Sequence, residues 1–124
     1  MSLKSLIASG TTLWLDSVDP ELVVQAKNAG ATGATSNPII VSDLIKTDRF
    51  DEPLRQLARE GKDDESIAWA LTDRLVRDAQ EQFYEAWKQS KGDTGWVSFE
   101  MEPLLEDVEA DLPHETRVKR YVEL

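Results

Sequence analysis

The sequence predicts an α/β fold in which short parallel strands alternate with helices. Three β-prone runs, residues 11–15, 31–36 and 96–99, are each bounded by glycine, proline or an acidic residue. Between them lie runs with the spacing of amphipathic helices, several of which open with a capping residue or a proline. Strand–helix units in series favour a parallel sheet with right-handed crossovers.

Local sequence signals predict the boundaries of the first strand and of the helices on either side of it. A short amphipathic helix is expected to open the chain and to end at Gly10. The first strand then ends at Asp16. Asp19, Pro20 and Glu21 predict the start of the next helix, because they supply a cap, a fixed φ and a negative charge at the positive end of the helix dipole. The inner face of this helix is expected to comprise Leu22, Val23, Ala26 and Ala29.

The second strand is stopped by Pro38, which cannot donate a ladder hydrogen bond and restricts the residue before it. We expect a helix directly after Pro38 and another from Pro53 to Gly61. A long helix follows, capped by Asp63 or Asp64. Its lack of a sustained heptad favours ordinary core packing over a coiled coil, and its buried stripe is predicted to be Ile67, Leu71, Leu75, Ala79, Phe83 and Trp87.

The C-terminal part is expected to form a turn over residues 91–95 and then the third strand, which ends at Glu100. Pro103 interrupts the chain after this strand. A last helix is expected to begin at Pro113, with apolar positions at Val118, Tyr121 and Val122.

Composition limits the function classes. The 124 residues correspond to one domain, contain no cysteine and only one histidine, His114, so thiol chemistry and histidine-rich metal sites are not expected. A net charge of −10 opposes binding to nucleic acid or to an anionic membrane. With no signal peptide and no membrane-spanning run in the sequence, we expect a cytoplasmic enzyme.

Polar side chains stand where each predicted strand ends: Asp16, then Thr35, Ser36 and Asn37, then Ser98 and Glu100. Because parallel strands end at the same rim, we expect these groups to converge there. Two carboxylates at one pocket can act as acid and base, and an asparagine can orient a hydroxylated substrate. Each residue alone also has an ordinary explanation: a helix cap for Asp16, a turn for Asn37 and a solvated surface position for Glu100.

Three segments together resemble the transaldolase family, a group of Schiff-base enzymes that act on sugar phosphates in the pentose phosphate pathway. The segments are Leu13-Trp14-Leu15-Asp16, Gly33-Ala34-Thr35-Ser36-Asn37-Pro38 and Val97-Ser98-Phe99-Glu100. The resemblance covers nearly the whole chain. It implies a (β/α)8 barrel, of which this chain would carry about three N-terminal units of eight.

The resemblance also implies roles for five of these residues. Asp16 matches the aspartate that handles protons during carbon–carbon cleavage, and Glu100 matches the glutamate that activates a catalytic water. Asn37 matches the asparagine that holds the dihydroxyacetone unit, while Thr35 and Ser98 match polar positions of the same pocket. The implied reaction transfers this unit between sugar phosphates of the fructose 6-phosphate, erythrose 4-phosphate and sedoheptulose 7-phosphate type, without a cofactor.

A Schiff base requires a desolvated lysine, and none of the seven lysines lies in or directly after a predicted strand. We therefore expect a single-domain N-terminal fragment, residues 1–124, that is inactive alone. Such a half-barrel would expose the barrel-facing side chains of Trp14, Val97 and Phe99. Association with the missing barrel half, or pairing of two copies, would cover them.

Two other functions fit the same sequence. A non-catalytic half-barrel, used for assembly or for binding sugar phosphates, would explain the missing lysine. A different lysine aldolase of similar barrel design would share the fold without the Asn37-Pro38 signature.

Overall fold

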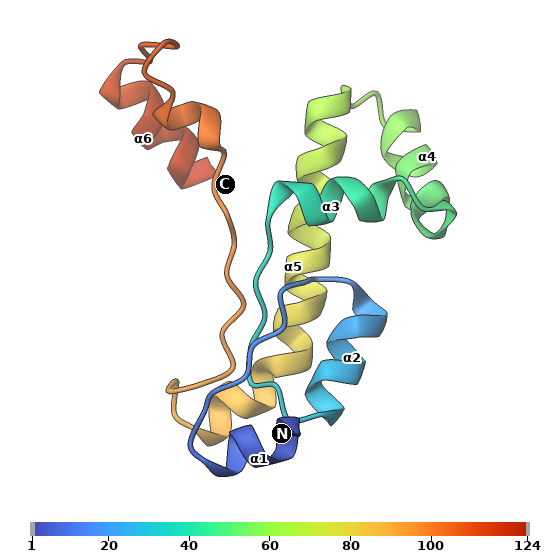
Figure 1. The fold of residues 1–124 in the computed structure, drawn as a ribbon. Coiled ribbons are helices and arrows are strands. Elements are labelled where there is room, and N and C mark those ends of the chain that lie inside the picture. Colours follow the sequence, from blue (N-terminus) through green and yellow to red (C-terminus); the bar gives the residue numbers. More distant parts are fainter. Residues whose placement is uncertain (1, 124) are drawn as a thin grey trace.

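The computed structural model describes residues 2–123, in which a long helix, α5 (Asp64–Gln89), runs beside three extended segments (Figure 1). The other α-helices are α1 (Leu3–Ala8), α2 (Pro20–Asn28), α3 (Pro38–Ile45), α4 (Asp51–Arg59) and α6 (His114–Glu123). Two 3-10 helices, η1 (Asp48–Phe50) and η2 (Pro103–Glu106), complete the order. Each predicted helix is confirmed, whereas η1 and η2 were not predicted.

The three predicted strands are replaced by extended segments that pair at single positions. Leu15 bridges Ala34, and Ala34 bridges Val97, both in parallel orientation, so the middle segment lies between the other two. Backbone bonds such as Leu15 N to Gly33 O (3.0 Å) and Ser98 N to Ala34 O (3.0 Å) form this short ladder. The parallel arrangement is as predicted, but the prediction of full strands over residues 11–15, 31–36 and 96–99 is wrong for the described residues.

The ladder is short for local reasons. Gly30 and Gly95 turn the chain with φ of +100° and +89° just before the second and third segments. Pro38 begins α3 directly after the second segment. The first and third segments pair only with the middle one.

Alternation along the segments separates a packed face from an open face. Val97 is buried and Phe99 is half-buried against the core, so the prediction that these two side chains face the barrel interior is wrong. Trp14 and Trp96 occupy the opposite face, where they are 39% and 52% exposed. The open face is therefore aromatic, as expected, but Trp96 contributes to it in place of Val97 and Phe99.

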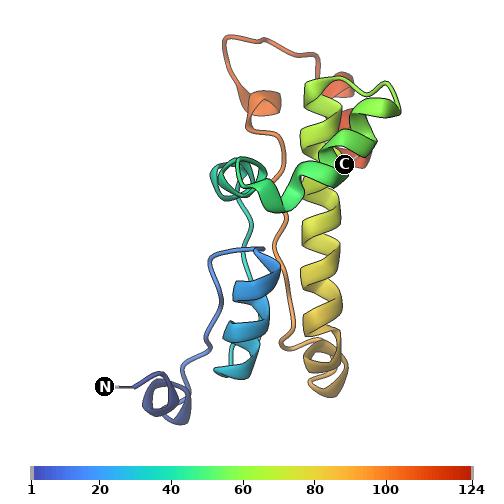
Figure 2. The same ribbon diagram turned by 90° about the vertical axis from the view of Figure 1, so that its right-hand side faces the viewer.

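The core lies between the packed face and the helices. α2 and α5 contact each other and stand side by side in Figure 2. α5 buries Leu71, Leu75, Val76, Ala79 and Phe83, so the centre of the predicted stripe is confirmed. Its ends are not, because Ile67 is only half-buried and Trp87 is exposed. On α2, Val23 and Ala26 pack inward, whereas Leu22 and Ala29 are exposed, contrary to the prediction.

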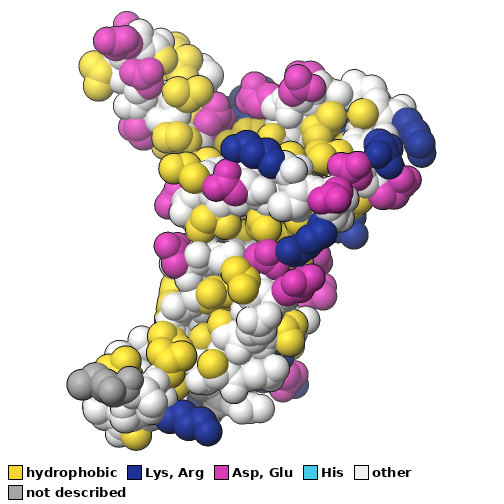
Figure 3. Space-filling view, turned by 45° about the vertical axis from the view of Figure 1, so that its right-hand side comes forward, with side chains coloured by type: hydrophobic (Ala, Val, Ile, Leu, Met, Phe, Trp, Pro, Cys, Tyr) yellow, Lys and Arg dark blue, Asp and Glu magenta, His cyan; other side chains and the backbone are white. Residues whose placement is uncertain are grey.

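The C-terminal part forms a separate lobe made of η2 and α6. Figure 3 shows this lobe standing apart from α3, with hydrophobic side chains in the hollow between them. Polar contacts hold α6 to η2 and to its N-cap. Arg120 donates to Glu102 at 3.1 Å, and Tyr121 Oη donates to Glu106 at 2.7 Å. Val118 and Val122, two of the apolar positions expected on the last helix, are exposed. Within residues 2–123, none of the helices combines the length and apolar character needed to cross a membrane.

Candidate active site

The five candidate residues lie at the ends of the three extended segments, next to the starts of α2 and α3 and the approach to η2. Asp16 follows the first segment and Thr35 belongs to the second. The Thr35 hydroxyl donates to Asp16 Oδ1 at 2.6 Å, across 19 residues of sequence. The structure therefore brings Asp16 and Thr35 together directly.

Asn37 is the N-cap of α3. Its backbone is extended, with φ −149° and ψ 159°, and its Oδ1 accepts from the backbone N–H of Ile40 at 2.9 Å. This cap fixes the direction of the side chain. The Nδ2 amino group takes no part in the cap, so it can donate to a ligand.

Asn37 and Glu100 line the same cavity, which has a volume of about 640 Å³ and lies between α3, α5 and the chain leading into η2. Its walls are largely apolar, and its charged members are Lys46, Glu65, Glu100 and Glu102. The other apolar and small lining residues include Val41, Ile45, Ala68, Trp69, Pro103 and Leu104. The remaining candidates, Asp16, Thr35 and Ser98, do not line this cavity.

Ser98 is an exposed residue on the third segment, with its side chain on the open face. Its backbone oxygen accepts from the hydroxyl of Ser36 at 2.8 Å. Ser36 is only 2% exposed, and this bond ties the second segment to the third just below Asn37. Ser36 was predicted among the polar groups at the end of the second strand, without a role of its own, and alternation between Thr35 and Asn37 places it on the packed face.

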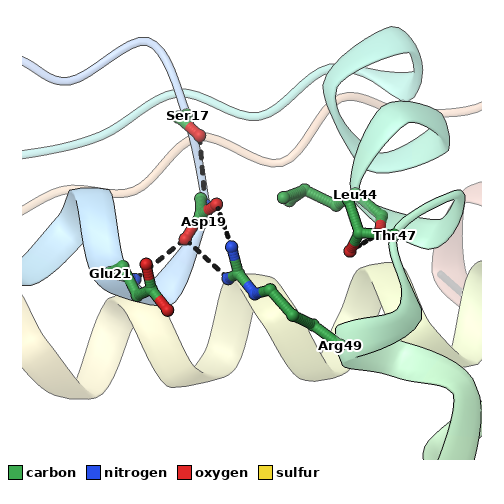
Figure 4. Close-up of polar contacts among 6 residues, drawn as sticks. All are labelled: Ser17, Asp19, Glu21, Leu44, Thr47 and Arg49. Carbon is green, nitrogen blue, oxygen red and sulfur yellow. Dashed lines mark hydrogen bonds and ion pairs between the residues drawn. The ribbon is translucent and has the colours of Figure 1, made fainter.

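Asp19 and Arg49 form a salt bridge beside the candidate site (Figure 4). The sequence did not predict this salt bridge. Two guanidinium nitrogens of Arg49 lie 3.0 and 2.9 Å from the two carboxylate oxygens of Asp19. Arg49 is the main reason that the pKa of Asp19 lies below its ordinary value, with a smaller contribution from the backbone N–H of Glu21 and against the opposing effect of burial. Asp19 was predicted only as a cap, because nothing local indicates a partner 30 residues away.

All seven lysines are exposed: Lys4, Lys27, Lys46, Lys62, Lys88, Lys91 and Lys119. Lys46 is the C-cap of α3 and lines the cavity that Asn37 and Glu100 share. Its side chain is 70% exposed and its Nζ lies 3.0 Å from Asp43 Oδ1. Lys46 is therefore solvated, whereas a Schiff-base lysine is desolvated in its pocket.

Comparison with known proteins now identifies the family. The family described as Transaldolase/Fructose-6-phosphate aldolase matches residues 13–122. The chain belongs to this family. Among curated relatives, the transaldolase of Parafrankia sp. is 34% identical over 110 residues, which is 83% of this chain. The transaldolases of Thiobacillus denitrificans and Frankia alni are 32% and 33% identical, over 82% and 83% of this chain.

The chain spans about 30% of the length of these transaldolases. Membership of the transaldolase/fructose-6-phosphate aldolase family implies a barrel as the parent fold. The matched region includes all five candidate residues, Asp16, Thr35, Asn37, Ser98 and Glu100.

Proposed function

We propose that the chain forms the first three βα units of a transaldolase barrel and carries the part of its site that binds the dihydroxyacetone unit of a sugar phosphate. The observation that carries the proposal is the placement of five family-type polar residues at the ends of three parallel segments. Two of them, Asp16 and Thr35, are hydrogen-bonded, and two others, Asn37 and Glu100, line one cavity.

The geometry supports different roles for the two carboxylates, Asp16 and Glu100. Thr35 occupies one oxygen of Asp16, which leaves the other free to exchange a proton with a substrate hydroxyl. Glu100 stands at the cavity with an exposed carboxylate, where it can accept a proton from water. Asn37 offers its Nδ2 group to a carbonyl or hydroxyl oxygen, and Ser98 offers a hydroxyl on the open face.

We propose that this 124-residue chain does not transfer the dihydroxyacetone unit by itself. The reaction requires a lysine amine that attacks the ketone of the donor sugar and is later released by water. Every lysine of the chain is exposed, and Lys46, which lines the cavity, is paired with Asp43. The catalytic amine is therefore proposed to come from another part of a complete barrel.

The same exposure of the lysines supports a second candidate function. A half-barrel without a Schiff-base lysine can act as a module for assembly or for binding sugar phosphates. Both candidates predict that sugar phosphates bind at the rim, and they differ in whether adding the remaining barrel produces transfer.

Binding can be tested on the 124-residue chain by NMR titration with fructose 6-phosphate. We expect the amide signals of residues 16, 35, 37 and 100 to move together and to saturate. Asn37→Ser should weaken binding while it keeps the helix cap, because serine caps as well as asparagine but lacks the amide group. Asn28→Ser, at the exposed end of α2, is the matched control and should bind like the wild type.

Three results would contradict these proposals. The site assignment fails if the signals that move lie elsewhere, or if Asn37→Ser and Asn28→Ser bind alike. The proposed inactivity fails if the purified chain exchanges the three-carbon unit between fructose 6-phosphate and erythrose 4-phosphate.

A further inference from the structure

The loop that follows Asp16 is unusually buried for a connection between an extended segment and a helix. Ser17, Val18 and Asp19 are 7%, 1% and 8% exposed, whereas Asp16 itself is exposed. None of these residues is a glycine, so the loop has little conformational freedom once its far end is fixed. Thr35 holds the Asp16 carboxylate directly at 2.6 Å, whereas the position of the Asp16 backbone depends on what holds the loop at Asp19.

Asp19 is held from three directions (Figure 4). Its backbone N–H donates to Ser17 Oγ at 3.0 Å, and its Oδ1 accepts from the backbone N–H of Glu21 at 2.9 Å, which caps α2. The two terminal nitrogens of Arg49 donate one hydrogen bond to each carboxylate oxygen of Asp19, at 2.9 and 3.0 Å. A bidentate arginine fixes the orientation of a carboxylate as well as its position.

Arg49 belongs to the structural unit that starts at Asn37. It lies in η1, which contacts α3, and α3 begins with the Asn37 cap. Thr47 donates its hydroxyl to Leu44 O at 2.7 Å, which closes the end of α3 and sets the entry into η1. The salt bridge thus joins the loop after Asp16 to η1, which contacts the helix that begins at Asn37, across 30 residues of sequence.

We propose that Arg49 is a positioning residue, which holds Asp16 at a fixed place relative to Asn37 through its salt bridge with Asp19. This inference rests on the proposed function, because it concerns the same rim. Capping alone does not explain Arg49, since the cap of α2 is made by Asp19 with the backbone of Glu21 and needs no arginine. The geometry of the pair gives Arg49 a second role, which is to couple two segments that carry different site residues.

The test compares variants that break the salt bridge with variants that leave it intact. Arg49→Gln removes the guanidinium, and Asp19→Asn removes the charge but keeps a good helix cap. Arg49→Lys keeps the charge but loses the bidentate geometry. Arg55→Gln is the matched charge control, because Arg55 pairs with Asp51 on the surface of α4. Phe83→Leu is the stability control, since Phe83 lies in the core on α5.

Two readouts are needed, both taken at a temperature where every variant is fully folded. Without ligand, Arg49→Gln and Asp19→Asn should shift the amide signals of Asp16 and Thr35, whereas Arg55→Gln should not. In titrations with fructose 6-phosphate, the same two variants should bind about tenfold or more weakly, since small misplacements of site groups carry large costs. Arg49→Lys should fall between them and the wild type, and Phe83→Leu should bind like the wild type.

The outcomes separate this inference from the proposed function. If Arg49→Gln and Asp19→Asn leave the Asp16 and Thr35 signals unchanged, the positioning role is refuted. It is also refuted if Phe83→Leu weakens binding as much as they do, because loss of stability would then explain the effect. If the wild type does not bind fructose 6-phosphate, the proposed function fails, and the ligand-free signals alone decide the role of Arg49.

Discussion

Replacing Gly33 with alanine tests the packing of the open face below the candidate site. A Cβ at this position would lie 2.6 Å from the backbone oxygen of Trp96 and 2.7 Å from Cε2 of Trp14. Ordinary contact begins near 3.4 Å, so these neighbours would have to retreat by about 0.7 to 0.8 Å. The Trp96 oxygen cannot retreat freely, because it accepts the backbone N–H of Ala34 at 3.0 Å.

The cost follows from this forced movement. Overpacking of a close contact typically costs about 1 to 3 kcal/mol. For a chain of 124 residues the entropy of unfolding is about 0.26 kcal/mol per kelvin, so the melting temperature should fall by about 4 to 12 °C. Thermal unfolding followed by circular dichroism measures this shift, with Ser98→Ala as a control on the same face that should change stability by less than about 0.5 kcal/mol.

A second substitution identifies the source of the clash. Trp14→Leu removes the indole but leaves the Trp96 oxygen in place, so Gly33→Ala should cost less in the Trp14→Leu background than in the wild type. An unchanged melting temperature in Gly33→Ala would refute the close approach of the first and third segments to Gly33. An equal cost in both backgrounds would place the whole clash on the backbone of Trp96.

Three further changes test other parts of the structure. Phe83→Ala should cost about 3 to 5 kcal/mol in urea unfolding because Phe83 is 1% exposed, whereas Val122→Ala, at an 82% exposed position, should stay within about 0.5 kcal/mol. The pKa of Asp19 is lowered in the folded state, so its contribution to stability is present above its unfolded pKa and is lost as the pH falls through the lower folded value. The stability difference between the wild type and Asp19→Asn should therefore be constant above about pH 5 and shrink below about pH 4, and a difference that grows on acidification would contradict the salt bridge. Asn37→Ala should lose about 1 kcal/mol by removing the cap of α3, and Asn37→Ser should retain most of it; equal losses would show that the cap is not the cause.

Local signals predicted the helices well because their ends are decided by nearby residues. Asp19, Asn37 and Asp63 each cap the helix that follows them, and all three caps use a side-chain oxygen and a backbone N–H within three residues. The stripe on α5 was predictable for the same reason, since helical spacing alone places Leu71 and Phe83 on one face.

Pairing between distant segments was less predictable. The sequence indicated β-prone runs, but the length of a ladder depends on contacts between segments far apart in the sequence, and here each pair of segments is bridged at one position. The Arg49–Asp19 pair was also missed, because it joins η1 to the N-cap of α2 across 30 residues of sequence. The prediction that Val97 and Phe99 lie on the open face was wrong because successive side chains of an extended segment point to opposite faces. Ser98 lies on the open face, so its two neighbours lie on the packed face.

The sequence predicted that the polar residues at the three strand ends form one site, whereas the structure places them in two groups. Asp16 bonds to Thr35, while Asn37 and Glu100 line a separate cavity between α3 and α5. Which strand ends share a cavity depends on the packing of α3 and η2, and no local pattern in the sequence records that packing.

We propose that this chain holds polar groups of a transaldolase site without its catalytic amine. Incubation of the 124-residue chain with fructose 6-phosphate and sodium borohydride, followed by intact-mass measurement, tests this directly, because borohydride fixes any Schiff base as a stable adduct. The account predicts that the mass stays at that of the unmodified chain, 14.0 kDa, in the wild type and in Lys46→Arg alike. A wild-type adduct of one reduced sugar phosphate that disappears in Lys46→Arg would contradict it, because the chain would then supply its own Schiff-base lysine.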